Sequence, residues 1–332
     1  MLKNYSTRRE FLNYGKLSLL LLLNSCSNSS RKISISLQSS FYPQSLKDTL
    51  PKSWEKEIIN LSKLDLIKNK KLSNSDYMLI NDGWINSLNF ENFQSLNNLF
   101  NNDRLDNRSK EFLNDFKEYQ SNKLFPIGVV PYAVVIKNNK NLISDASQSW
   151  DFLLAEKLKG KIIFPQSPRI IMSILKKINA KNSFSKLKNQ VMLFDDQNSI
   201  NWLINSQATV AIVPYSQCVK YLKFDSRLSI VFPNKGVPLI WYFLLSKSKV
   251  NNQILIDWIK SFENRKTIDL LANEGWYLPF NDEYSQNKYN INSKYNNSGP
   301  SKICWENSWS LPPINKKEKS NLENLWNQSS TP

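Results

Sequence analysis

Short apolar runs alternate with amphipathic stretches along residues 32–280 of the chain. Contiguous or alternating apolar residues, which are typical of strands, occupy residues 33–37, 77–80, 127–136, 161–164, 209–213 and 239–245. Apolar residues at helical spacing lie between these runs, at residues 51–64, 108–120, 149–154, 168–178, 198–205 and 254–262. Strands that alternate with helices predict an α/β fold with largely parallel sheets.

Two prolines add local expectations to this pattern. Pro51 precedes Trp54, Ile58 and Leu61, whose spacing predicts a helix that begins at the proline. Pro131 lies inside the longest apolar run. Because proline cannot donate to a strand ladder, we expect Pro131 at a sheet edge or at a crossing point rather than at the centre of a sheet.

The composition excludes several classes of catalyst. The chain of 332 residues has no histidine, which excludes Ser-His-Asp and Cys-His catalysis and histidine-liganded zinc or iron. It has seven glycines, and none stands in the frame of a nucleotide-binding or esterase loop. We therefore expect a globular protein of about two domains without the usual catalytic chemistry, with no catalytic residue, metal site or cofactor.

The net charge is strongly positive. Lysine and arginine number 44 against 28 aspartate and glutamate, which gives a formal charge of +16. A nucleic-acid-binding protein clusters such charge on one element with interleaved aromatic residues. Here the lysines are spread along the chain among Asn, Ile and Ser, as an AT-biased codon usage would give. We therefore expect no nucleic-acid partner.

The N-terminus has the pattern of an export signal. Arg8 and Arg9 are followed by Phe-Leu and then by an apolar run at residues 17–23. As a helix this run is too short to span a bilayer, which needs about 20 residues. The paired arginines resemble the twin-arginine export motif. The alternative is a cytoplasmic protein with an apolar first helix.

The end of this signal resembles a lipobox. Residues 23–26 read LNSC, although Asn24 stands where a smaller residue is usual. We expect residues 1–26 to act as a lipoprotein signal and the lipidated Cys26 to anchor the mature protein to the membrane in the periplasm. Of the other cysteines, Cys218 and Cys304 can pair in an oxidising envelope. The apolar helical surroundings of Cys218 favour a buried free thiol.

Three motifs in register resemble a known family. Residues 150–153 (WDFL) with 159–164 (KGKIIF), residues 209–215 (TVAIVPY) and residues 273–279 (NEGWYLP) resemble segments of bacterial extracellular solute-binding proteins. Their order and spacing agree best with the spermidine/putrescine-binding branch. The resemblance covers roughly residues 32–280.

The resemblance implies an α/β fold of two lobes with a hinge and a ligand cleft between them, as in type 2 periplasmic binding proteins. Carried onto this chain, the two crossings fall near residues 128–132 and 237–241. Lobe 1 would then take residues 32–128, completed by about 241–280, and lobe 2 residues 129–240. We expect residues 281–332, which are rich in Asn, Lys and Ser, to form a polar tail that docks partly onto the body.

The resemblance also implies a function. The protein would be a monomeric, lipid-anchored, non-enzymatic component that hands a small solute to an ABC permease and its ATPase. Two alternatives stay open. Four Ser-x-x-Lys pairs allow an exported hydrolase, although its companion motifs are absent. The chain could also be an envelope lipoprotein that kept the binding fold without transport.

Candidate ligand residues follow the carboxyl ends of strands, where ligands bind in open α/β sheets. Aromatic residues of the same segments would add walls to the site. The candidates are Gln38, Ser39, Phe41, Asp82, Trp84, Ser167, Arg169, Tyr215, Trp241, Tyr242 and Tyr277.

The solute itself stays open at this point. Asp82 can accept an ammonium group or serve the Asp-Gly turn. Ser167 and Arg169 at the start of a predicted helix favour an anion. Carboxylates of the polyamine-binding branch match Ser167 and Ile170 in this chain, so their charges are missing. The residues therefore permit a polyamine, an amino acid, an anion or a monocationic amine, with iron as a weaker option.

Overall fold

The structure is a computed structural model. It describes residues 32–38, 42–59, 75–96, 104–179, 183–247, 253–280 and 299–311, with 313, 314, 317, 318, 320, 321 and 324. The described residues from Ser34 onward belong to one compact unit. The predicted signal residues Arg8, Arg9 and Cys26 lie outside the described residues. Within the described part of the chain, no helix is both long and apolar enough to cross a membrane.

Ten strands among the described residues form one continuous sheet. Their order is β2-β1-β3-β9-β4-β7-β5-β6, with β10 paired to β9 and β8 paired to β4. The bounds are β1 Ser34–Gln38, β2 Glu55–Ile59, β3 Tyr77–Asn81, β4 Phe125–Lys137, β5 Ile162–Phe164, β6 Val191–Phe194, β7 Val210–Pro214, β8 Leu228–Val231, β9 Pro238–Ser246 and β10 Trp309–Ser310.

The long strand β4 divides this sheet into two parts. Its residues 125–131 pair with β9, and its residues 132–137 pair with β7 and β8. We define lobe 1 as β2, β1, β3, β9 and the first part of β4, and lobe 2 as the second part of β4 with β7, β8, β5 and β6. Pro131 is the last residue of β4 that pairs with β9, so it lies where β4 changes partners.

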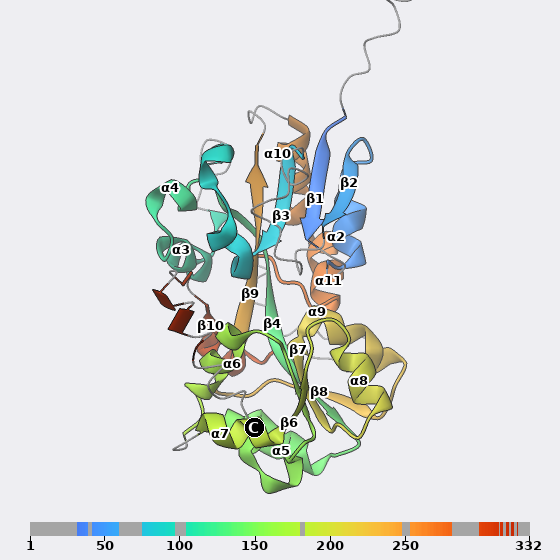
Figure 1. Ribbon diagram of the computed structural model, residues 1–332. Helices are drawn as coiled ribbons and strands as arrows, with labels where there is room; N and C mark the ends of the chain where they lie inside the picture. Colours follow the sequence, from blue (N-terminus) through green and yellow to red (C-terminus); the bar gives the residue numbers. More distant parts are fainter. Residues whose placement is uncertain are drawn as a thin grey trace, which may run out of the picture. The chain divides into compact units, whose positions relative to one another are not determined.

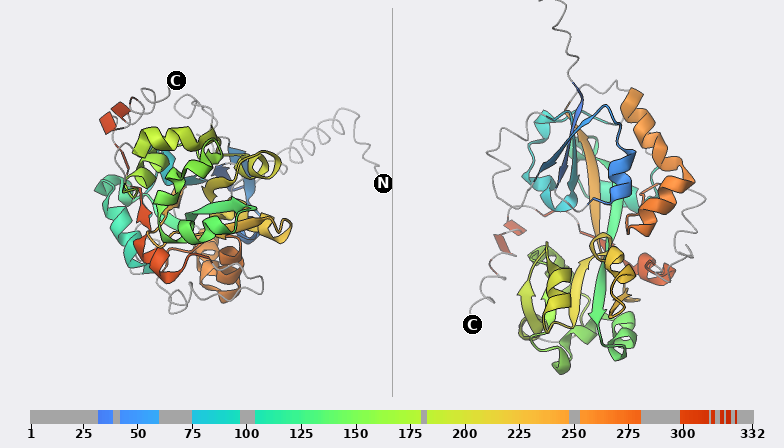
Figure 2. Two further views of the ribbon diagram at one scale, coloured as in Figure 1. Left: turned by 90° about the horizontal axis from the view of Figure 1, so that it is seen from below. Right: turned by 90° about the vertical axis from the view of Figure 1, so that its right-hand side faces the viewer.

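Helices cover both lobes (Figures 1 and 2). In lobe 1, α2, α10 and α11 lie on one side of the sheet and α3 and α4 on the other. The α-helices are α2 Gln44–Thr49, α3 Asn107–Asn114, α4 Glu118–Ser121, α5 Asn141–Gln148, α6 Pro168–Leu175, α7 Ser183–Gln190, α8 Ser199–Asn205, α9 Tyr215–Cys218, α10 Gln253–Lys260, α11 Arg265–Asn273 and α12 Lys302–Asn307. The 3₁₀ helices are η3 Asp82–Ser87, η4 Phe90–Asn92, η6 Trp150–Leu154, η7 Glu156–Leu158, η8 Val219–Lys223 and η9 Ser261–Glu263.

The core is centred on strands β4 and β9. All nine residues of β9 are buried, as are twelve of the thirteen residues of β4. Strands buried on both faces appear in a sequence as continuous apolar runs, which is why both were predicted. Gly128 of β4 lets the chain pass close to Trp276, because a Cβ atom there would lie 2.0 Å from Trp276 Cε2. Only glycine fits at that contact.

The predicted parallel sheets are confirmed in part. The β2-β1-β3 and β7-β5-β6 segments are parallel, as expected for strands joined through helices. At the centre, β9 runs antiparallel to both β3 and β4, and β4 runs antiparallel to β7.

The helix predicted from Pro51 is wrong. Residues Glu55–Ile59 form β2, which pairs in parallel with β1 at the edge of the sheet. Trp54 is buried and stacks on Tyr77 with ring centroids 4.9 Å apart, whereas Ile58 is 61% exposed. Pairing with β1 decides the conformation here, because strand preference depends on tertiary context more than on the local pattern.

The C-terminal segment, defined as residues 299–311, packs against both lobes. Its β10 adds a parallel strand to β9. Before it, the Trp305 ring lies 5.1 Å from the Tyr277 ring and 5.2 Å from the Arg108 guanidinium carbon. On the lobe 2 side, Lys177 of the α6 region places its ammonium 4.8 Å from the Trp309 ring. Residues 281–298 of the predicted tail lie outside the described residues.

Candidate functional site

Two candidate ligand residues, Asp82 and Arg169, contact each other. Arg169 Nη2 lies 3.2 Å from Asp82 Oδ2, and the side chains are 15% and 4% exposed. Arg169 Nη2 also donates to the main-chain oxygen of Leu311 in the C-terminal segment. Burial raises the pKa of Asp82, against the opposing effects of Arg169 and of a main-chain hydrogen bond from Trp241. The Asp82 carboxyl group is therefore held against the Arg169 guanidinium rather than open to solvent.

Four of the six aromatic candidates lie in the core. Tyr215, Trp241, Tyr242 and Tyr277 are each at most 4% exposed. Each packs against another ring: Tyr215 on Phe232, Trp241 on Phe112, Tyr242 on Trp276 and Tyr277 on Trp305. Desolvation raises the pKa of Tyr215 and of Tyr242, so both stay neutral phenols at physiological pH.

The remaining candidates lie at strand ends and in short helices. Gln38 ends β1, and Ser39 and Phe41 lie outside the described residues. Trp84 is half-buried in η3. Ser167 precedes α6 at the N-cap position, and its side chain makes no capping hydrogen bond.

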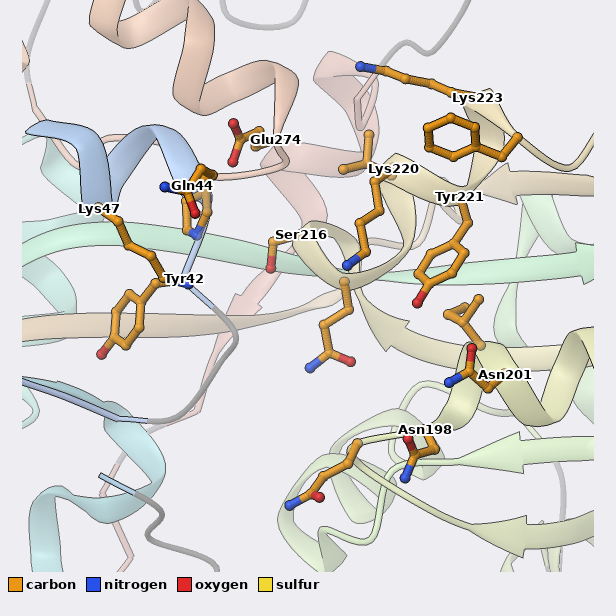
Figure 3. A pocket seen from close by; sticks show the side chains of 16 residues that line it. Tyr42, Gln44, Lys47, Asn198, Asn201, Ser216, Lys220, Tyr221, Lys223 and Glu274 are labelled. Atoms are coloured by element: carbon orange, nitrogen blue, oxygen red, sulfur yellow. The ribbon is translucent and has the colours of Figure 1, made fainter. Parts of the chain in front are cut away.

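A pocket of about 560 Å³ opens between the lobes (Figure 3). One wall comes from the start of α2 and the end of α11, and the other comes from α8, α9 and η8. The described candidates from the sequence do not line it. Its lining residues are Tyr42, Pro43, Gln44, Lys47, Gln197, Asn198, Ile200, Asn201, Ser216, Gln217, Val219, Lys220, Tyr221, Lys223, Phe224 and Glu274.

The sequence analysis missed this pocket for two local reasons. No apolar run predicts strand β6, and the loop at its end holds the lining residues Gln197 and Asn198. At the end of β7, the aromatic candidate Tyr215 is buried, whereas its neighbours Ser216 and Gln217 line the pocket. The sequence feature that indicates these pocket residues is a run of polar residues directly after each strand, the short strands included.

Both cysteines of the body are free and buried. Cys218 and Cys304 form no disulfide with each other. Desolvation raises the pKa of the Cys218 thiol and raises that of Cys304 to about 12. The described residues contain no group of Cys, Asp and Glu side chains that could hold a metal ion.

Comparison with protein-family models and with curated protein sequences gives no match. Solved structures do match over nearly the whole chain. The spermidine/putrescine ABC transporter substrate-binding protein of Streptococcus pneumoniae gives a TM-score of 0.64 at 13% identity, covering 90% of this chain and 98% of that one. The TpPotD lipoprotein of Treponema pallidum gives 0.59 at 13% identity, with the same two coverages of 90% and 98%.

A protein named for a different ligand matches in the same way. The ferric binding protein of Campylobacter jejuni gives a TM-score of 0.53 at 14% identity, covering 90% of this chain and 99% of that one. Proteins named for different solutes thus share one architecture with this chain. The chain has the two-lobed α/β fold of type 2 periplasmic binding proteins, as the resemblance implied.

Proposed function

We propose that the protein is the substrate-binding component of an ABC importer. The supporting observation is the pocket of about 560 Å³, whose walls come from both lobes. A solute that contacts both walls favours the closed arrangement, because only contacts that differ between the open and closed arrangements shift the equilibrium between them. The protein then delivers its small solute to a membrane permease and its ATPase as a monomer, without covalent chemistry of its own.

The hinge belongs to the same proposal. We place the two crossings near residues 128–132 and 237–241, with lobe 1 made of residues 32–128 and about 241–280 and lobe 2 of residues 129–240. The change of strand partners at Pro131 supports the first crossing. Closure around these crossings needs no change inside either lobe.

The cellular place of the protein is also proposed. Residues 1–26, with Arg8 and Arg9, act as a twin-arginine-type signal, and the lipidated Cys26 holds the mature protein at the periplasmic face of the membrane. A substrate-binding component works at this location because its permease lies in the same membrane. Metabolic labelling with a fatty acid checks the anchor: Cys26→Ala abolishes the label if the proposal is right.

The hydrolase alternative has less support. A serine–lysine catalyst needs the lysine amine beside the serine hydroxyl. In the first Ser-x-x-Lys pair, Lys56 Nζ donates instead to the main-chain oxygen of Lys47 at 3.1 Å. The lysine of the pair Ser53-x-x-Lys56 thus makes its hydrogen bond away from the serine.

Solute binding tests the proposal directly. Thermal unfolding of the purified chain is measured against amino acids, organic acids, sugars and polyamines. A solute at 100 times its dissociation constant adds about 2.7 kcal/mol to the free energy of unfolding, which raises the melting temperature. If no solute of any class raises it, the proposed function is wrong.

A pair of variants on α8 tests the place of binding. Asn201 is exposed and lines the pocket, whereas Asn205, one turn further along, is exposed and does not line it. Asn201→Trp fills the pocket and abolishes binding of a solute that the wild type binds, and Asn205→Trp leaves binding unchanged. Equal binding by both variants would place the solute elsewhere.

A further inference from the structure

The charged side chains that line the pocket are mostly cationic. Lys47 comes from α2 in lobe 1, and Lys220 and Lys223 come from η8 beside lobe 2. In Figure 3 the side chain of Lys220 points into the space between the two walls, toward the wall that holds Lys47 and Gln44. Within the described part of the chain, no carboxylate forms an ion pair with Lys47 or Lys220.

The one lining carboxylate among the described residues is already engaged. Glu274 follows α11, and its oxygens accept from the main-chain nitrogen of Ser45 at 3.3 and 3.4 Å. Ser45 lies in the first turn of α2, whose own N-cap residue, Pro43, offers no side-chain acceptor. Glu274 therefore serves the start of α2, where a negative charge is favourable.

Two aspartates beside the pocket are also engaged. Asp195 accepts from the main-chain nitrogens of Gln197 and Asn198 at 2.6 and 2.7 Å. Asp196 accepts from the main-chain nitrogen of Gln166 at 2.9 Å. Neither aspartate lines the pocket, so neither carboxylate lies where a bound solute would contact it.

Neutral donors complete the lining. The side-chain amides of Gln44, Gln197, Asn198, Asn201 and Gln217 surround the pocket, together with the phenols of Tyr42 and Tyr221. Ser216 Oγ is buried at the wall and has no hydrogen-bond partner among the described residues. A buried hydroxyl without a partner costs free energy unless a bound molecule supplies one.

We propose that this pocket binds a small organic anion, with its carboxylate or phosphate group between Lys47 and Lys220 and hydrogen-bonded to Ser216. The inference rests on the proposed function, since it assigns the class of solute at the same site. One ammonium on each lobe faces the anion, so binding it draws the two walls together. A carboxylate and a phosphate share this chemistry and differ in geometry and charge.

The same residues disfavour a polyamine. A desolvated ammonium group needs a carboxylate partner or its burial is costly. Glu274 is engaged with α2, and Asp82 is paired with Arg169 outside the pocket. The described lining thus supplies positive charge where a polyamine requires negative charge.

Calorimetric titration with chosen probes tests the inference. The purified full-length chain is titrated with citrate, inorganic phosphate and glycerol 3-phosphate, and in parallel with putrescine and spermidine. We expect at least one anion to bind and neither polyamine to bind. Binding of citrate but of neither phosphate compound identifies a carboxylate solute. Binding of a phosphate compound but not of citrate identifies a phosphorylated one. Affinity also falls as the NaCl concentration rises.

Matched variants tie the binding to the two lysines. Lys220→Gln and Lys47→Gln each lower the affinity for the anion about tenfold or more, because each variant loses a charge-assisted hydrogen bond. Lys260→Gln, on the exposed end of α10, leaves affinity unchanged. Lys220→Arg keeps the charge and retains most of the affinity, which separates charge from folding.

The outcomes separate this inference from the proposed function. Binding of putrescine or spermidine without any anion overturns the inference and leaves the substrate-binding function standing. An anion that binds Lys220→Gln and Lys47→Gln as tightly as wild type overturns the assignment to this pocket. If no probe of either charge and no neutral solute binds, both are wrong.

Discussion

Arg169 and Asp82 meet across the junction of the lobes, with Arg169 Nη2 3.2 Å from Asp82 Oδ2. Asp82 begins η3 directly after β3 of lobe 1, and Arg169 lies in the first turn of α6 after β5 of lobe 2. Because Arg169 also donates to Leu311, the pair connects both lobes to the C-terminal segment. Two of the candidate ligand residues thus form an ion pair with each other at the junction.

Arg169→Met is expected to destabilise the fold. It leaves the carboxylate of Asp82, which is 4% exposed, without its cationic partner. Removing one partner of a buried ion pair costs about 3–5 kcal/mol. Urea unfolding at pH 7 measures the loss. The double variant Arg169→Met/Asp82→Leu, which removes both charges, is expected to recover much of it; wild-type stability of the single variant would contradict the contribution of the pair.

The pH dependence of stability is expected to carry a contribution from Asp82. Burial raises the pKa of this group in the folded state above its ordinary value of 3.8. Between those two pKa values the folded state binds more protons than the unfolded state, so the contribution of Asp82 to stability falls as pH rises. The difference in unfolding free energy between wild type and Asp82→Asn therefore decreases as pH rises from about 4 through the raised pKa. A difference that grows with pH over that window would mean that the pKa is lowered instead.

Gly275→Ala is expected to lower both stability and solute binding. Gly275 has φ of +78°, and a Cβ atom would lie 2.8 Å from the main-chain nitrogen of Ser216. The change therefore adds backbone strain and pushes on a pocket wall, with a cost of about 1–3 kcal/mol. Gly160→Ala is the control, since Gly160 has φ of +64° with nothing within 4 Å of the added atom. Thermal unfolding measures stability and titration measures solute binding, and the binding defect is expected only for the Gly275 variant. Equal binding defects in both variants would show that the contact with Ser216 is not the cause.

Trp305→Ala is expected to loosen the C-terminal segment. The Trp305 side chain is 7% exposed and packs between Tyr277 and Arg108. Truncating a buried tryptophan costs about 3–5 kcal/mol. Ile303→Ala changes the same helix, α12, at a position that is 58% exposed and should change stability little. Chemical denaturation compares the two, and similar midpoints would show that the segment adds nothing to the stability of the body.

The strands were predictable because burial on both faces produces continuous apolar runs. The runs that became β3, β4 and β9 stand out in the sequence for this reason. The edge strand β2 and the half-buried strand β6 do not, since their side chains are largely in contact with solvent. Their conformation comes from hydrogen bonding to β1 and β5, which no local pattern contains.

The candidate site divides in the same way. The sequence predicts that ligand residues lie at the ends of strands. Among the candidates there are charged and aromatic residues such as Asp82, Trp241 and Tyr242. In the folded protein the rings of Trp241 and Tyr242 are buried in the core, and Asp82 forms an ion pair with Arg169. The pocket is lined by less conspicuous amides and lysines on helices of both lobes.

The sequence by itself determined the alternation of strands and helices, the absence of histidine chemistry and the resemblance to two-lobed binding proteins. These follow from local periodicity, composition and short motifs. Only the tertiary structure decided which charges neutralise each other and which face a pocket. Asp82 and Arg169 are separated by 87 positions in the chain and meet only because two strand ends are brought together. A side chain's partner in space, rather than its identity, sets whether its charge is available to a solute.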